Sequence, residues 1–154
     1  MEQDLQSLLK QFYPYAQKRL GFNKPARVLF KDDPENAKAI LGKTAYYDPD
    51  KMEVTVFTTG RHIKDIMRSV SHELTHHDQN CRGLLKNDED AQEGYAQKDP
   101  HLRKMEEDAF KRGNIIFRDF EDELKSKRKD LYEALQIKKC IRIILGWKLV
   151  INVI

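Results

Sequence analysis

Residues 61–80 read RHIKDIMRSVSHELTHHDQN, and this stretch decides which fold the chain is expected to adopt. Its apolar residues recur three and four positions apart, which is the spacing of one face of an amphipathic helix. These residues are Ile63, Ile66, Met67, Val70 and Leu74. The spacing predicts one long helix whose apolar face packs in the core. His72 and His76 then lie one helical turn apart, on a face roughly opposite the apolar stripe.

The HExxH pattern within this helix predicts a metal site. Two imidazoles one turn apart can chelate a single ion, and histidine nitrogens are common ligands of zinc. Glu73 is expected on the flank of the helix, where its carboxylate can reach a water molecule whose pKa the zinc lowers. His77 points about 100° away from His76, so it is expected to be packed or hydrogen-bonded rather than to bind the metal. The alternative is a surface helix that carries two histidines and no metal.

A catalytic zinc ion usually takes a third protein ligand and leaves a fourth position open. The downstream candidates are Glu89, Glu93, His101, Glu106, Glu107 and Asp108. A helix is predicted from Asp99-Pro100 onwards, with a break at Gly113-Asn114 left open. Its inward face is expected to hold Leu102, Ala109, Phe110, Gly113, Phe117, Phe120 and Leu124. Glu106 falls within that stripe, where a carboxylate is costly unless a cation or hydrogen bonds satisfy it. We therefore expect Glu106 to be the third ligand, with pairing to Arg61 or Arg68 as the alternative.

The remaining segments carry helix and strand signals in turn. Helices are predicted for residues 1–20 and 33–41, strands for 26–30, 44–47 and 52–58, a hairpin turn for 48–51, and a loop for 82–99. Pro14 is expected to kink the first helix or to split it in two. The second helix has clear signals at its ends, with Asp33 as the N-cap and Gly42 just past the last residue.

Two pieces of the sequence together resemble the gluzincin group of zinc peptidases. The first is HELTH at residues 72–76, and the second is EEDAF at residues 106–110. The second piece is similar to the ExxA pattern of the ImmA/IrrE and related families, in which the first glutamate is the third zinc ligand. Carried over to this sequence, that glutamate is Glu106. The segments HELTHHDQN, LRKMEEDAFKRGN and IIFRDFED also resemble small predicted peptidases of tailed bacteriophages.

The resemblance covers residues 44–122 and implies a compact α+β fold of the minimal zincin type. In that fold a small mixed or antiparallel sheet packs on the HExxH helix, and further helices follow towards the C-terminus. The implied activity is that of a metallopeptidase acting on a protein or peptide. One Zn²⁺ ion would bind to His72, His76 and Glu106, and Glu73 would be the catalytic base. An edge strand beside the cleft would pair with the substrate backbone, and residues 53–57 (EVTVF) are the candidate.

No motif in the sequence identifies a residue that would stabilise the transition state. A peptidase needs a hydrogen-bond donor for the developing oxyanion besides the metal itself. Tyr95 and His101 are the candidates, although each is also an ordinary residue for a polar loop.

The composition is typical of a soluble globular protein. The chain has 154 residues, and its 28 basic and 25 acidic side chains leave a net charge of +3, which predicts no obligate polyanionic partner. Cys81 and Cys140 lie far apart, and the N-terminus is acidic before it is apolar. These features predict a cytoplasmic protein, of a bacterial host if a phage encodes it. The apolar segment 141–154 is too short to span a membrane.

Residues 1–139 are predicted to form a single domain, followed by an apolar tail, residues 140–154, which is a candidate hairpin packed on the domain or a docking site. The basic cluster at residues 125–129, with Lys138-Lys139, is predicted to be a solvated helix face. A contact with nucleic acid is the weaker alternative for this cluster. The main alternative function is a non-catalytic protein that binds metal or serves as a structural or DNA-associated component, for instance of a phage. A SprT-like peptidase acting on DNA-bound proteins is a third hypothesis. The oligomeric state is not predicted.

Overall fold

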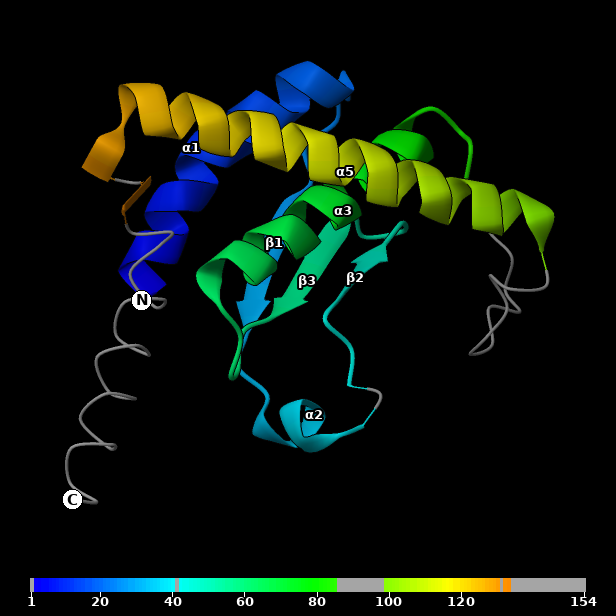
Figure 1. Ribbon diagram of the computed structural model, residues 1–154. Coiled ribbons are helices and arrows are strands. Elements are labelled where there is room, and N and C mark those ends of the chain that lie inside the picture. The colour runs from blue at the N-terminus through cyan, green and yellow to red at the C-terminus, as the bar shows by residue number, and fades with distance from the viewer. Residues whose placement is uncertain (1, 41, 86–98, 131, 134–154) are drawn as a thin grey trace.

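The computed structural model of the chain describes residues 2–40, 42–85, 99–130 and 132–133, and Figure 1 shows how its elements are arranged. The helices are α1 (Glu2–Leu20), α2 (Pro34–Lys38), α3 (Ile63–Cys81) and α5 (Pro100–Lys127). The strands are β1 (Arg27–Lys31), β2 (Ala45–Asp48) and β3 (Glu53–Phe57). The predicted α+β fold, with a small mixed sheet packed against the HExxH helix and a later helix, is confirmed.

The three strands form one mixed sheet in the order β1-β3-β2. Strands β2 and β3 make the predicted hairpin, with Ala45 opposite Val56, whereas β1 pairs with β3 in parallel. The Asp48 side chain closes the hairpin turn by accepting a hydrogen bond of 3.0 Å from the backbone N–H of Lys51. The expectation that residues 53–57 form the edge strand is therefore wrong. The hairpin pattern is local, and it carries no information about β1 pairing with the far side of β3.

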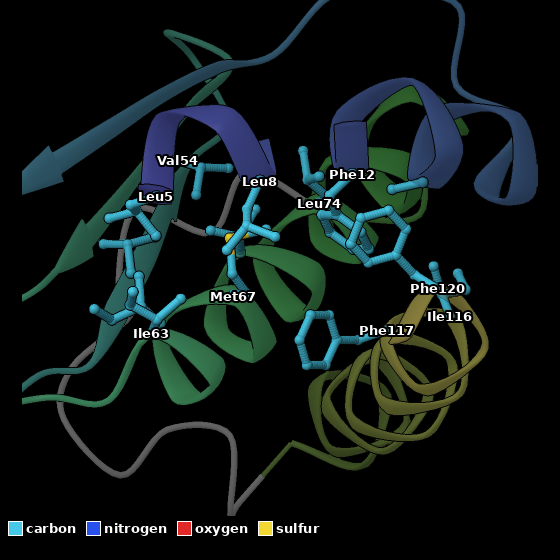
Figure 2. Close-up of a cluster of buried hydrophobic side chains, with 14 of the residues drawn as sticks. Leu5, Leu8, Phe12, Val54, Ile63, Met67, Leu74, Ile116, Phe117 and Phe120 are labelled. Carbon is cyan, nitrogen blue, oxygen red and sulfur yellow. The ribbon is translucent and has the colours of Figure 1, made fainter. Parts of the chain in front are cut away.

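Helix α3 lies between the sheet and α5, and α1 runs beside it (Figure 1). Helix α1 buries one apolar face, on which Leu8 and Phe12 have no exposed surface. Figure 2 shows these side chains meeting the apolar face of α3 and the Phe117 and Phe120 rings of α5. The Phe12 ring packs edge-on against the Phe120 ring, with the centroids 5.0 Å apart. One core therefore packs α1 and α5 against α3, the helix that carries the histidines.

The predicted N-cap residue of α2 is correct, but the predicted end of this helix is not. Asp33 caps α2 as expected, since its side chain accepts a 3.0 Å hydrogen bond from the N–H of Asn36. The helix nevertheless ends at Lys38, short of the predicted residue 41. The Asn36 side chain binds both backbone groups of Lys43, and this contact turns the chain back. Helix α1 continues through Pro14 without splitting in two.

Helix α5 begins as predicted, because the Asp99 side chain accepts a hydrogen bond of 2.7 Å from the N–H of His101. The helix then runs past Gly113 and Asn114, so the break that the sequence left open does not occur there.

Several predictions fall outside the described residues or are not tested by them. The tail at residues 140–154 and most of the loop at residues 82–99 lie outside the described part, together with Glu89, Glu93 and Tyr95. That residues 1–139 form a single domain stays a prediction. Within the described residues, no helix is both long enough and apolar enough to cross a membrane.

Candidate metal centre

Three side chains from two helices converge at one point beside the sheet. The Nε2 atoms of His72 and His76 lie 3.1 Å apart. Each Nε2 atom also lies 3.3 Å from a different carboxylate oxygen of Glu106, on α5. These three residues form a group whose candidate ligand atoms all lie within 4.8 Å of one another. The helical spacing of the histidines and the choice of Glu106 among the acidic residues thus lead to one place in the structure.

The spacing of these atoms suits a zinc ion. In a tetrahedral centre, bonds of about 2.05 Å place neighbouring ligand atoms roughly 3.3 Å apart. The 3.1 Å between the two nitrogens, and the 3.3 Å from each nitrogen to one of the two Glu106 oxygens, are close to that spacing. Two imidazoles and one carboxylate are also a ligand set that leaves the fourth position open. The residues present therefore fit zinc in both donor type and distance.

Close contact between the backbones of α3 and α5 brings Glu106 within reach of the histidines. A Cβ atom added at Gly113 would lie only 3.1 Å from the Cα and N atoms of His72. The hydroxyl of Ser71, which is fully buried, donates a 2.8 Å hydrogen bond to the Gly113 carbonyl. The sequence suggested a helix break at this glycine, but its role is to let α5 pack directly on the histidine helix.

Gln79, which no pattern in the sequence indicated, holds the His76 ring in place. Its Oε1 atom lies 2.9 Å from His76 Nδ1, and its amide nitrogen donates to the Met105 carbonyl (3.0 Å) and to Asp108 Oδ2 (2.9 Å). A carbonyl and a carboxylate only accept hydrogen bonds, so the amide nitrogen must face them and Oε1 must face the histidine. His76 therefore carries a proton on Nδ1, and its Nε2 atom faces Glu106 and His72.

A set of ion pairs around the buried Asp78 carboxylate extends this contact. Asp78, only 1% exposed, lies 2.8 Å from Arg82 and 2.9 Å from Arg112. Arg112 also lies 3.1 Å from Asp108, so one guanidinium bridges the carboxylates of α3 and α5. Although burial acts to raise the pKa of Asp108, hydrogen bonds from Gln79 and Arg112 hold that pKa below its usual value. The ionised carboxylate is a strong acceptor for the Gln79 amide.

The available sequence signals for this network were weak. Gln79 follows His76 by three positions, and Asp108 precedes Arg112 by four, which are neighbour spacings on a helix. Nothing in the sequence shows that the two pairs face each other.

Glu106 differs in one respect from its predicted environment. It lies at the edge of the apolar stripe, with a side chain that is 51% exposed, rather than in its buried middle. Hydrogen bonds with His72 and then His76 hold the pKa of Glu106 well below its usual range, although burial opposes them. The alternative arginine partners are engaged elsewhere. Arg61 donates to backbone carbonyls such as that of Phe57, and Arg68 pairs with Asp65.

Glu73 lines the same space as the three candidate ligands. It is 8% exposed, and burial raises the pKa of its carboxyl above the usual value. The neighbouring His76 and His72 oppose that rise, while Glu106 adds to it. A carboxylate with a raised pKa is a better proton acceptor near neutral pH than a solvated one.

A cleft of about 880 Å³ opens over the site. One wall is the edge strand β2 with the turn that follows it, another is the histidine face of α3, and the third is the N-terminal half of α5. Phe110 lies on the rim and is 68% exposed, so the expectation that it belongs to the inward face is wrong. It follows Ala109, which is fully buried, and the helix turns the bulkier neighbour out of the core.

The other candidates lie away from this centre. His77 is fully buried and hydrogen-bonded, with Nδ1 2.8 Å from the Tyr47 hydroxyl and Nε2 2.8 Å from the Lys24 carbonyl, so the prediction of a packed histidine is confirmed. His101 Nε2 lies 2.8 Å from the Leu84 carbonyl, and this histidine is not among the described residues that line the cleft. Glu107 is exposed on another face of α5.

No protein-family model matches the chain, and neither a curated protein nor a solved structure matches it. The fold and the site therefore define the chain only as an α+β protein with a candidate metal centre of two histidines and one glutamate.

Proposed function

We propose that this protein is a zinc-dependent metallopeptidase that hydrolyses peptide bonds in the cleft between β2, α3 and α5. The observation that carries the proposal is the convergence of His72, His76 and Glu106, with the cleft beside them and Glu73 in its wall. A structural zinc site is usually closed by four protein ligands, whereas three ligands facing a cleft leave room for water and a substrate.

The zinc ion, Glu73 and Gln79 each have a role in this proposal. Bound zinc would supply a Lewis acid that lowers the pKa of a coordinated water molecule. The carboxylate of Glu73 would take a proton from the attacking water and pass it to the leaving nitrogen of the substrate. Gln79 would keep the His76 ring oriented during turnover, because it binds the nitrogen that faces away from the cleft.

Strand β2 supports a peptide substrate in particular. It is the edge of the described sheet, and its residues Ala45, Tyr46 and Tyr47 line the cleft. An edge strand offers unpaired backbone N–H and C=O groups, and an extended peptide can pair with them largely independently of its side chains. The strand that the sequence suggested for this role, residues 53–57, has partners on both sides and is unavailable for it.

The test combines metal analysis with hydrolysis. The purified protein should hold close to one zinc ion per chain, and Glu106→Gln should lose most of it. The matched control is Glu107→Gln, because Glu107 is the exposed neighbour outside the ligand group and should leave the zinc content unchanged.

Glu73→Gln is isosteric and should keep its zinc while the hydrolysis of labelled casein or of a random peptide library falls by roughly 10²- to 10⁴-fold. Zinc binding with no hydrolysis by the unmodified protein would favour the non-catalytic metal-binding alternative. Full hydrolysis by Glu73→Gln would refute the role of Glu73.

A further inference from the structure

Helices α3 and α5 form two walls of the cleft and run antiparallel to each other. The two ends of the cleft differ chemically. Gln79, near the C-terminal end of α3, contacts the carbonyl of Met105, near the start of α5. Ser71, closer to the middle of α3, contacts Gly113, further along α5. The candidate ligands lie between two sets of lining residues, one beyond the C-terminal end of α3 and one towards its N-terminal end.

One end of the cleft is apolar. Leu85 lies just past the end of α3, and Leu102 and Met105 belong to the first two turns of α5. The hairpin turn faces this end, since Asn80 Nδ2 donates to the Pro49 carbonyl at 3.2 Å. Asp50 follows in that turn and also lines the cleft, so a carboxylate brought to this end would meet a like charge.

The other end is polar and basic. Arg68 precedes His72 by one helical turn and lines the cleft together with Ser69 and Asn114. Its guanidinium lies 3.0 Å from Asp65, but the two side chains are 47% and 55% exposed. An ion pair that is so exposed to solvent contributes little stability, so a carboxylate of a bound peptide can compete for the guanidinium.

We propose that the cleft selects extended peptides with a large apolar side chain on one side of the bond to be cleaved and a carboxylate on the other. The apolar side chain packs between Leu85 and Leu102, and the carboxylate pairs with Arg68. A peptide bound in the reverse direction is disfavoured, because its carboxylate would lie near Asp50 and away from Arg68. This inference rests on the proposed function, because it names the substrate class of the same site.

Peptide binding tests the inference without requiring turnover. The probe set consists of three labelled peptides that differ at the two outer positions, Leu-Ala-Ala-Asp, Leu-Ala-Ala-Lys and Ser-Ala-Ala-Asp, each within the same glycine-rich flanks. Dissociation constants are measured by fluorescence anisotropy on zinc-loaded Glu73→Gln. The first peptide should bind most tightly, about 5-fold tighter than the lysine peptide and roughly 10-fold tighter than the serine peptide.

Two pairs of variants, each made in the Glu73→Gln background, assign the preference to the named ends. Arg68→Glu should reverse the order of the aspartate and lysine peptides, whereas Lys104→Glu, at an exposed position outside the described lining, should not. Leu102→Ser should abolish the preference for leucine over serine, whereas Ile115→Ser, at an exposed position on the same helix, should keep it.

Equal dissociation constants for the three peptides, or an unchanged order in Arg68→Glu, would overturn the inference. Either result would leave the proposed function untouched, because hydrolysis by the unmodified protein is a separate measurement. Selective binding without hydrolysis would overturn the peptidase proposal instead.

Discussion

Replacing Gln79 tests the link between the two helices of the metal centre most directly. Gln79 is fully buried, and Gln79→Leu removes three contacts at once: those with His76, the Met105 carbonyl and Asp108. Asp108 keeps Arg112 as a partner, and the Met105 carbonyl lies within α5 and keeps its helical hydrogen bond, so the N–H of His76 is the group left without a partner. Leaving a buried polar group unpaired costs about 1–3 kcal/mol. We expect the free energy of unfolding of the metal-free protein to fall by about 1–3 kcal/mol.

The effect on zinc is expected to be separate from the effect on stability. A partner that orients a metal-binding histidine is typically worth 10- to 100-fold in metal affinity. Gln79→Leu should therefore bind zinc about 10- to 100-fold more weakly, as measured by competition with a chelator at a temperature where both proteins are folded. The absorption spectrum of the cobalt-substituted protein should change as well, because it reports the geometry around the ion.

A charge exchange provides the matched control. Gln79→Glu keeps an acceptor for His76 but brings a second carboxylate against Asp108, and it should weaken zinc binding. Adding Asp108→Asn restores one amide and one carboxylate at this contact with their positions exchanged, so the double variant should recover most of the affinity. If Gln79→Leu bound zinc as tightly as the unmodified protein, with an unchanged cobalt spectrum, Gln79 would have no positioning role.

Two further predictions concern the packing around the site. At an exposed helix position, replacing glycine with alanine stabilises a protein by about 1 kcal/mol. Gly113→Ala should instead destabilise this protein by roughly 1–3 kcal/mol, as measured by chemical denaturation. The reason is that the new Cβ atom would lie 3.1 Å from backbone atoms of His72. Zinc affinity should fall with it, since α5 must move away and Glu106 moves with it; unchanged affinity would mean that the contact does not set the position of α5. Phe12→Ala should cost about 3–5 kcal/mol, because this fully buried ring packs on Phe117 and Phe120. A loss below about 1 kcal/mol in the same denaturation experiment would contradict the packing described for α1.

Local features of the sequence determined the helices, the strands and the histidine pair of the candidate site. A helix has a fixed period, so the spacing of His72 and His76 alone puts two imidazoles on one face. Caps are also local, since an N-cap side chain reaches backbone groups only two or three residues away. Asp33 and Asp99 therefore begin helices where the sequence predicted them to begin.

Features that depend on contacts between elements were predicted only in part. Glu106 was identified because a carboxylate near an apolar stripe needs a partner, and because of the resemblance to known zinc peptidases. Its half-exposed position and the exposure of Phe110 were not foreseen. A helical wheel gives the direction of each side chain but not the width of the face that a neighbouring helix covers.

The sequence by itself thus determined that His72 and His76 share one face of a helix and where helices begin, because period and capping act over one or two turns of chain. Only the tertiary structure decided which strand borders the cleft, why Gly113 lies against His72, and that Gln79 joins His76 to α5. Strand order and helix packing depend on residues far apart in the chain. Their contacts are selected by the burial of the whole core and not by any local pattern.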